Sequence, residues 1–362
     1  APQLMVALRR AASNCLEEFV RDYAPNQARL AEFVPMLLPA LDLNVGVPKV
    51  IASMYKDNLE LCHAIPESLI QTYCAKIEQH GVELGQLWSF TDLLEYVMVA
   101  RGVPVRRSQN IVAKALLDRS YTQVCVTFCE PADASDPKSS VGFTRRRELL
   151  RGYDATFEDP SARTLRYHAR CIRLLAICCL GKHTANELKC RMRVPFEVVA
   201  EVLQDSKTFA CPEVATAFAK FLFTVYLETD ADPKAILSGY DTINITNHPL
   251  MWGCMATFAR AILKYAKSGT DLLENFVFDG ALPCIDLLFR KIVSVQAVLQ
   301  DAARNAGMND NHPSVAASNA VEVIRSSLQA VAENRSLSPT QFLLLTNAAK
   351  AVGLDTGDAW KN

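Results

Sequence analysis

Apolar residues recur along most of this chain at the spacing of three to four residues that places them on one face of a helix. The first such pattern begins at Leu4 and ends at Asp22. A second runs from 28 to 41 and contains Pro35 and Pro39, so we expect a kinked or split helix, because proline removes a backbone donor and clashes one turn back. Further helices are predicted over 48–64, 66–80, 83–100, 108–119, 161–180, 183–192, 195–205, 211–228, 233–237, 249–267, 270–276, 282–306, 313–334 and 338–352.

The pattern in 211–228 predicts a central helix. Large apolar side chains cover much of its circumference, namely Phe218, Phe221, Leu222, Val225 and Tyr226. A helix that is apolar on most of its sides is buried, whereas a surface helix carries a single apolar stripe.

The segment before residue 160 departs from the helical spacing. Residues 121–129 alternate in polarity as a strand does, with a helix end as the alternative. Residues 130–159 are rich in Pro, Asp, Ser and Gly, which predicts a long surface loop with a short helix at 145–150.

The succession of helices indicates the fold class. Antiparallel helix pairs joined by short loops, at intervals of about 40 residues, are typical of the armadillo or HEAT type of helical solenoid. We therefore predict an all-α fold, with one elongated solenoid domain over 1–362 that carries the polar loop at about 130–160. A candidate sub-boundary lies near 268–280.

Composition narrows the class of protein. Hydrophobic residues make up 50% and charged residues 21%, which is far from the composition of disordered chains. Lys+Arg number 38 and Asp+Glu 39, so the net charge of -1 gives no broad attraction to nucleic acid or to an anionic membrane. No window approaches the ~18 uninterrupted apolar residues of a membrane span, and no signal peptide is present, which predicts a soluble chain. Because the sequence starts without Met, we expect a piece of a longer protein.

The common signatures of enzymes are missing. Gly181-Lys182-His183 contains the Gly-Lys pair of a phosphate-binding loop but neither its upstream Gly nor its Ser/Thr. The sequence has no G-x-G-x-x-G, no nucleophile elbow and no His-Glu-x-x-His. We therefore predict no catalytic residue and no cofactor.

The cysteines and histidines do not form a metal motif. Twelve Cys lie singly inside apolar helical patterns, which favours buried free thiols in a reducing compartment. Cys125 and Cys129 are four apart, Cys62-His63 has no partner pair nearby, and the His residues are scattered, at 63, 80, 168, 183, 248 and 312. A Cys/His pair brought together by folding is left open.

The acidic segment 228–232 has oxygen ligands at alternate positions, as calcium loops do. Pro233 follows where a turn glycine is needed, so capping of the next helix by Asp230 or Asp232 is the favoured interpretation. We predict no metal site.

The densest positive patch is the one candidate binding surface. Four arginines at spacings of 3, 4 and 3 form a stripe on the helix 161–180, and a second group precedes it: Arg163, Arg166, Arg170 and Arg173, with Arg145, Arg146 and Arg147. The patch suits an acidic partner, an inositol phosphate or RNA, and a solvated face is the structural alternative. Nucleic acid is the least favoured, because no aromatic residues interleave with the arginines to stack on bases.

Several segments together carry a resemblance to a known family. They are Asn26–Ala28, Asn58–Cys62, Leu87–Gly102, Gln109–Leu116, Tyr167–Arg170, Leu174–Cys178, Gly181-Lys182, Glu187–Cys190, Val194-Pro195, Pro212–Val214, Tyr226–Asp230 and Lys234–Ile236. In this order and spacing they resemble the middle of the cytosolic part of inositol trisphosphate receptors, in the homology domain shared with ryanodine receptors. The similarity is colinear over about 8–266 and strongest over 167–236, and the chain departs from the family mainly at 131–160.

The resemblance implies a piece of a very large tetrameric calcium-release channel of the endoplasmic reticulum. In that family this region is an armadillo-like domain on the cytosolic side, between the upstream ligand-binding modules and the downstream pore. It would couple ligand sensing to gating, with the other domains and subunits of the channel as partners, no nucleic acid and no insertion of this segment into the membrane. No ligand or ion residue is carried over. Two other hypotheses are a free-standing interaction solenoid that binds an acidic partner through the basic patch, and a calcium or small-molecule sensor.

Overall fold

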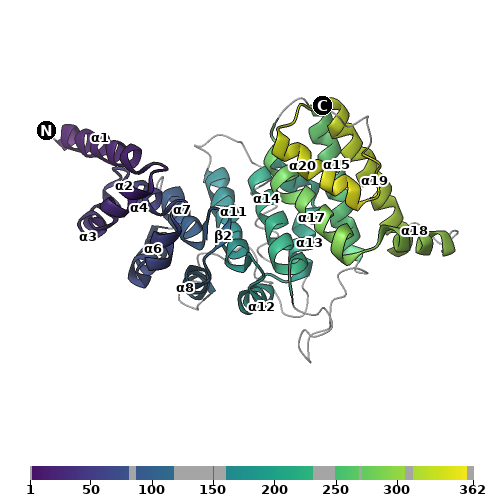
Figure 1. Cartoon of the computed structure of the whole chain (residues 1–362), viewed down its shortest axis with the longest axis horizontal. Helices are drawn as coiled ribbons and strands as arrows, with labels where there is room; N and C mark the ends of the chain where they lie inside the picture. Colours follow the sequence, from purple (N-terminus) through teal and green to yellow (C-terminus); the bar gives the residue numbers. More distant parts are fainter. Residues whose placement is uncertain are drawn as a thin grey trace. The chain divides into compact units, whose positions relative to one another are not determined.

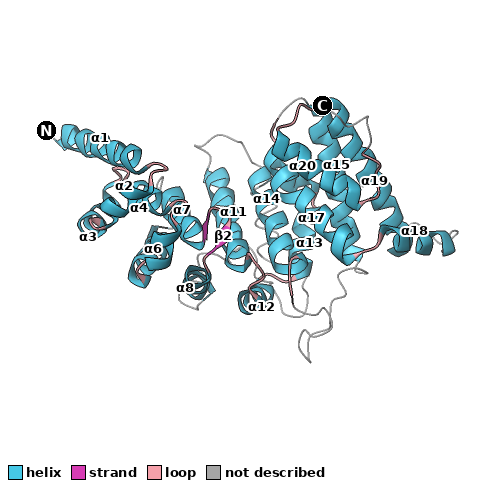
Figure 2. Cartoon of the chain, viewed as in Figure 1, coloured by secondary structure: helices cyan, strands magenta, loops and turns pink. Residues whose placement is uncertain are grey.

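The computed structural model describes residues 2–80, 87–117, 150, 160–230, 249–268, 271–305 and 313–356. In this part of the chain helices account for nearly all regular structure, and one two-stranded hairpin is the exception (Figure 2). Helices that follow one another in sequence pack side by side, as α6 does on α7 and α13 does on α14. The predicted all-α fold of the armadillo or HEAT type is confirmed.

Contacts between Cα atoms group the chain into two compact units. Unit 1 comprises Ala1–Thr127 and Arg170–Lys189, and unit 2 comprises Phe128–Ala169 and Cys190–Asn362. The division falls within two helices, α11 (Pro160–Cys179) and α12 (Thr184–Arg193). The single elongated domain over 1–362 and the sub-boundary near 268–280 stay predictions.

Unit 1 begins with a series of short helices, coloured purple to blue in Figure 1. They are α1 (Pro2–Val20), α2 (Ala24–Ala31), α3 (Val34–Leu37), the 3-10 helix η1 (Leu38–Leu43), α4 (Val47–Tyr55), α5 (Leu59–Ala64), α6 (Glu67–His80), α7 (Leu87–Met98) and α8 (Arg106–Leu117). The split predicted for 28–41 is confirmed, because Pro35 and Pro39 each lie in the first turn of a separate helix.

The core of unit 1 lies between α4, α6 and α7. Tyr73 of α6 and Phe90 of α7 meet edge to face at 5.3 Å, and neither ring is accessible beyond 1%. The Tyr73 hydroxyl donates to the carbonyl of Pro48 at 3.3 Å, so the buried phenol has a hydrogen-bond partner.

The helix predicted over 48–64 is wrong as one element, because α4 ends at Tyr55 and α5 begins at Leu59. Asp57 takes a left-handed conformation with φ of 55°. The buried Gln27 side chain donates to the carbonyls of Ser53 and Lys56 at 3.1 Å, and Asn58 donates to Gln27 at 2.9 Å. This amide network satisfies carbonyls at the end of α4 and stabilises the break.

The helix predicted over 83–100 is also too long. It ends at Met98 and leads into a hairpin of β1 (Val99–Ala100) and β2 (Val103–Pro104), which pair antiparallel. Arg101 and Gly102 form the two-residue turn with φ of 51° and 75°, as a type I′ turn requires. The backbone N–H of Arg101 donates to Asp57 Oδ1 at 2.8 Å, which fixes the turn against the α4–α5 connection.

The helices that lie wholly in unit 2 are coloured teal to yellow in Figure 1. They are α13 (Phe196–Gln204), the 3-10 helix η3 (Ser206–Ala210), α14 (Pro212–Phe221), α15 (Pro249–Ser268), α16 (Glu274–Phe276), α17 (Leu282–Leu287), α18 (Val295–Arg304), α19 (Pro313–Asn334) and α20 (Pro339–Ala351). Three π-helical turns extend or join them: η4 (Leu222–Leu227), η6 (Val277–Ala281) and η7 (Leu288–Ile292).

The central helix predicted in 211–228 is confirmed. Phe218 and Phe221 of α14 are fully buried. Two aromatic side chains from other helices, Phe209 and Phe258, pack edge to face on the ring of Phe276 at 4.9 and 5.3 Å. Because α14 packs on α16 and on η6, these aromatic contacts belong to one hydrophobic core.

The helix predicted over 282–306 is interrupted. After the π turn η7 the backbone becomes extended at Val293, and Ser294 caps α18 by accepting from the N–H of Ala297 at 3.3 Å. Several predicted elements lie outside the described residues: the helix over 233–237, the strand or helix end at 121–129 and the polar loop at 130–159. The short helix predicted at 145–150 also lies outside them, except for its last residue.

Candidate functional site

The arginine stripe predicted on 161–180 lies on α11, with one arginine in each successive turn from Arg163 to Arg173. Arg145, Arg146 and Arg147 lie outside the described residues. Of the four stripe residues, Arg163 and Arg166 fall in unit 2, and Arg170 and Arg173 fall in unit 1. All four side chains are half-buried.

In unit 1 the stripe meets acidic residues of α7. Arg170 Nη1 lies 2.8 Å from Asp92 Oδ1 and 4.0 Å from Glu95 Oε2. Arg173 donates from Nε to Glu95 Oε2 at 2.9 Å and from Nη2 to Glu95 Oε1. The second pair has the two-point geometry of a guanidinium with a carboxylate, the strongest form of a protein ion pair.

The pKa of Asp92 is raised by this environment. Burial is the largest cause because it disfavours the charged carboxylate, and the neighbouring Glu95 acts in the same direction. The charge of Arg170 and its hydrogen bond to Asp92 oppose this effect without overcoming it. The cluster therefore holds a carboxyl group that is protonated more readily than a surface aspartate.

In unit 2, Arg166 Nε lies 3.5 Å from Glu213 Oε1 at the start of α14. Arg166, Arg170 and Arg173 of α11 therefore each have an acidic partner within their own unit. They hold helices together, and binding of an acidic partner by the patch stays a prediction.

Sequence reasoning missed the acidic side of this cluster. Asp92 and Glu95 lie three residues apart on α7, and Arg170 and Arg173 lie three residues apart on α11. The signal in the sequence was the equal spacing of the two pairs. Residues three apart share one helix face, so two acids on one helix can pair with two arginines on another. The pairs are separated by 78 residues, which hides them from any local pattern.

Gly181-Lys182-His183 forms the turn between α11 and α12 and not a phosphate-binding loop. Gly181 and Lys182 both have positive φ, 77° and 65°. Gln109 of α8 donates to the carbonyls of Ile177 and Leu180 at 2.9 and 3.0 Å. These bonds give hydrogen-bond partners to carbonyls that the end of α11 leaves without a partner inside the helix. Burial and the charge of Arg106 lower the pKa of His183.

The cysteines that the structure describes are buried except Cys15, so the prediction of buried free thiols is confirmed for those. Burial raises the pKa of Cys62, Cys74 and Cys254 to about 12. In the Cys62-His63 pair, Cys62 Sγ donates to the carbonyl of Tyr55 at 3.1 Å, so this thiol is hydrogen-bonded within the core. A thiol with so high a pKa is a poor nucleophile at neutral pH.

Within the described ranges no group of three or more His, Cys, Asp or Glu side chains could hold a metal ion. Asp232 of the acidic segment, the helix it was expected to cap, and Cys125 and Cys129 lie outside those ranges. The described helices also include none that is long and apolar enough to cross a bilayer.

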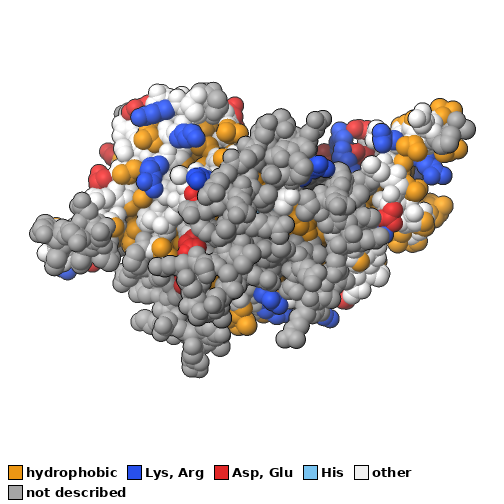
Figure 3. Space-filling view, turned by 180° about the vertical axis from the view of Figure 1, so that it is seen from behind, with side chains coloured by type: hydrophobic (Ala, Val, Ile, Leu, Met, Phe, Trp, Pro, Cys, Tyr) orange, Lys and Arg blue, Asp and Glu red, His pale blue; other side chains and the backbone are white. Residues whose placement is uncertain are grey.

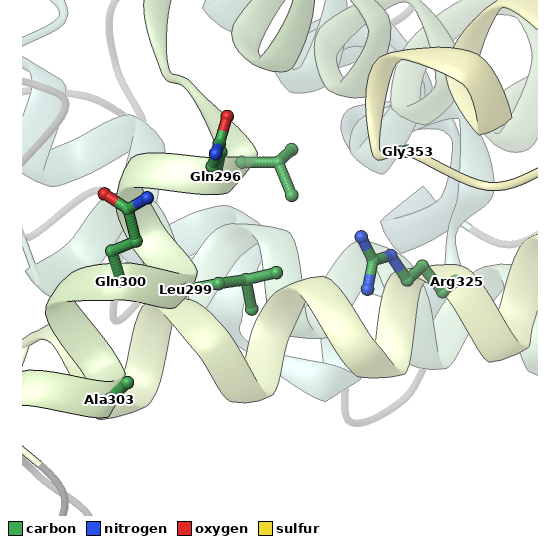
Figure 4. Close-up of a pocket in the computed structure, with 7 residues that line it drawn as sticks. Gln296, Leu299, Gln300, Ala303, Arg325 and Gly353 are labelled. Atoms are coloured by element: carbon green, nitrogen blue, oxygen red, sulfur yellow. The ribbon is translucent and has the colours of Figure 1, made fainter.

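A shallow pocket of about 450 Å³ lies in unit 2 between α18 and the carboxyl-terminal helices (Figure 4). Its lining is Val295, Gln296, Leu299, Gln300, Ala303, Arg325 and Gly353. Arg325 is its one charged side chain, and it donates from Nε to the carbonyl of Val352 at 2.8 Å and pairs with Glu322 at 2.8 Å. The lining contains no nucleophile or general base, so the pocket has no group for acid–base catalysis.

Comparison with known proteins gives two findings. Residues 3–124 match the model of the RIH domain. Over 235 residues, 64% of this chain, the sequence is 24% identical to the inositol 1,4,5-trisphosphate receptor of Caenorhabditis elegans, of which it spans 8%. These two matches confirm the predicted resemblance: the chain is similar to an inositol trisphosphate receptor, and its amino-terminal third is similar to the RIH domain.

Proposed function

We propose that this chain is a regulatory scaffold of an intracellular ligand-gated calcium-release channel. In this proposal it lies on the cytosolic face of the endoplasmic reticulum, between the ligand-sensing part and the pore of a larger polypeptide. The observation that carries the proposal is the colinear match to an inositol trisphosphate receptor that is more than ten times longer than the matched segment.

The packing of the helices supports a mechanical role. Aromatic cores, capped helices and ion pairs make each unit a rigid element, as a part that transmits displacement must be. Coupling by rigid-body movement also needs neighbouring domains whose contacts differ between channel states. Those neighbours would be other domains and subunits of the channel.

The proposal assigns no ligand, cofactor or catalytic step to the chain itself. Arg166, Arg170 and Arg173 of α11 are engaged with the carboxylates of Glu213, Asp92 and Glu95, which weakens the case for an inositol phosphate or acidic partner at this stripe. The free-standing interaction solenoid is therefore the less favoured function.

A chimeric channel tests the coupling role. The matched segment of the Caenorhabditis elegans receptor is replaced by this chain, and inositol trisphosphate binding and evoked calcium release are measured on microsomes. We expect binding and release to persist in the chimera. Adding Phe221→Ala, which opens a cavity in the core of unit 2, should reduce release several-fold and leave ligand affinity unchanged, whereas Phe33→Ala at an exposed position should change neither.

Two results would contradict the proposal. Loss of inositol trisphosphate binding in the chimera would place ligand recognition in this segment, and normal release from the Phe221→Ala chimera would show that its integrity is not needed for gating. Calorimetry of the isolated chain with calcium and with inositol trisphosphate is the companion test, and we expect no heat beyond dilution.

A further inference from the structure

The exposed face of α15 carries positive charge and no negative charge. The only charged residues of this helix are Arg260, Lys264 and Lys267, and all three side chains are exposed. Spacings of four and three residues place them on one face of the helix, over about 10 Å along its axis. We call these three residues the α15 row. In Figure 3, Lys and Arg side chains are visible at the upper left, on the part of unit 2 that contains α15 and α19.

The α15 row differs from the arginine stripe of α11 in its partners. Arg260 donates to the hydroxyl of Thr257 at 2.9 Å, and in the part of the chain that the structure describes none of the three cations forms an ion pair with a carboxylate. The acids of α19, which packs along α15, are engaged within their own helix. Glu322 pairs with Arg325 at 2.8 Å, and Glu333 accepts a side-chain hydrogen bond at 2.9 Å.

The stability of α15 does not account for the row. The helix dipole stabilises cations in the last turn of a helix, but only Lys267 lies in the last turn of α15. Arg260 and Lys264 are four residues apart, and Lys264 and Lys267 are three apart, so like charges repel one another along the helix face. Carboxylates of a partner would remove this repulsion, which the chain itself leaves without compensation.

The spacing of the α15 row indicates the kind of anion that fits it. A single phosphate group needs cations that converge on one point, and Arg binds it at two points, whereas the row contains two lysines and extends over about 10 Å. Anionic lipid is typically bound by clusters of about four to eight cations, which is more than the row provides. Carboxylates at the same helical spacing on a second helix would face all three cations at once.

We propose that the α15 row docks on an acidic helix of another domain of the same channel polypeptide. This inference rests on the proposed function, in which the chain lies between other domains. Exposed ion pairs contribute little each, so the row fixes the register and orientation of the contact more than its strength. Linkage in one polypeptide raises the effective concentration of the partner helix, so a weak contact is sufficient.

Fluorescence anisotropy with a labelled helical peptide tests the proposal on the whole chain. The probe is an alanine-rich peptide with Glu at positions i, i+4 and i+7, and the same peptide with Gln at these positions is its control. At about 20 mM salt we expect the Glu peptide to bind and the Gln peptide not to bind. Raising the salt to about 150 mM should weaken binding several-fold, because salt ions screen exposed charges.

Charge reversal separates the position of the row from the net charge of the chain. The triple variant with Arg260→Glu, Lys264→Glu and Lys267→Glu should raise the dissociation constant of the Glu peptide at least about tenfold. The matched control changes the net charge by the same amount and should have a much smaller effect. It reverses to Glu three cations that are exposed on other elements of unit 2: Lys207, Lys291 and Lys350.

Three results would overturn the proposal. They are equal binding of the Glu and Gln peptides by the original chain, equal loss of binding in the two triple variants, and binding of phosphatidylserine vesicles in place of the peptide. Circular dichroism should show an unchanged fold because the row is exposed, and the double variant Lys264→Gln, Lys267→Gln replaces the triple variant if it does not. None of these measurements involves calcium release, so a failure of this inference is distinguishable from a failure of the chimeric channel.

Discussion

Arg173 of α11 and Glu95 of α7 form a two-point ion pair although 78 residues separate them in the sequence. Both side chains are more than half-buried, and Arg170 continues the contact one turn earlier toward Asp92. The pair fixes the rotation of α11 about its axis against α7 within unit 1. A helix whose arginines look like a binding surface is, at this place, a structural brace.

Arg173→Ala should lower the free energy of unfolding by about 1 to 2 kcal/mol, because it leaves a largely buried Glu95 carboxylate without its donors. Glu95→Gln should cost less, since an amide oxygen still accepts one of the two hydrogen bonds. Urea denaturation of the single variants and of the double variant gives the coupling energy. Arg304→Ala, which removes an exposed ion pair with Asp301 on α18, is the control and should change stability by less than about 0.5 kcal/mol.

The stability of the chain should depend on pH through Asp92. Because its pKa is raised above 3.8, chiefly by burial, the folded chain holds this proton more tightly than the unfolded chain does. The stabilisation that Asp92 contributes is fully present below pH 3.8, and it is lost as the pH rises through the raised pKa of the folded chain. Asp92→Asn cannot titrate, so the difference in urea midpoint between this variant and the original chain should shift in favour of the variant over that range.

A pH series from the acid range to neutrality measures this difference. Asp301→Asn, the same chemical change at an exposed position of α18, serves as the control. A difference between Asp92→Asn and the original chain that stays constant with pH would show that Asp92 has no raised pKa in the folded state.

The sequence predicts helices well where their ends are coded locally. Proline and glycine mark most boundaries, and Ser338 and Gln341 form the capping box that begins α20, one residue after the predicted start. The break between α4 and α5 could not be predicted, because it depends on a residue of another helix. The buried Gln27 of α2 donates to the carbonyls of Ser53 and Lys56. A contact across 26 residues leaves no trace in a local pattern.

The candidate site shows the same limit. The spacing of the arginines was sufficient to place them on one face of α11, as the structure has them. What that face meets depends on how α7 and α11 pack, and the sequence pattern alone does not contain this information. The sequence therefore predicts a solvated face or a partner-binding face, whereas in the structure Asp92 and Glu95 of α7 contact Arg170 and Arg173 of the stripe.

Phe221→Ala should destabilise the chain by about 3–5 kcal/mol, because the ring is fully buried and its removal leaves a cavity in the core of unit 2. Thermal or urea unfolding followed by circular dichroism measures the loss. Phe33→Ala removes a ring that is about half exposed and should cost much less. Equal effects of the two changes would place Phe221 at the surface and contradict the central position of α14.

Thiol reactivity should separate Cys15 from the buried cysteines. Cys15 is exposed on α1, whereas burial raises the pKa of Cys62, Cys74 and Cys254 to about 12. Brief treatment of the folded chain with iodoacetamide at pH 8, followed by peptide mass spectrometry, should label Cys15 and leave these three unlabelled until urea is added. Rapid labelling of Cys62 in the folded chain would contradict its place in the core.

Two glycines with the same backbone conformation but different surroundings allow conformational strain to be separated from steric exclusion. Gly102 in the hairpin turn and Gly181 after α11 have φ of 75° and 77°. A Cβ at Gly102 would meet nothing within 4 Å, whereas a Cβ at Gly181 would lie 2.8 Å from Pro104 Cγ. Gly102→Ala should therefore lower the free energy of unfolding by about 1 kcal/mol, which is the strain of a non-glycine residue in the left-handed conformation. Gly181→Ala should cost distinctly more, because the β2 end of the hairpin must also move, and urea unfolding of both variants with the original chain gives the comparison. If the two substitutions cost the same, Pro104 yields freely, and the hairpin does not hold the α11–α12 turn in place.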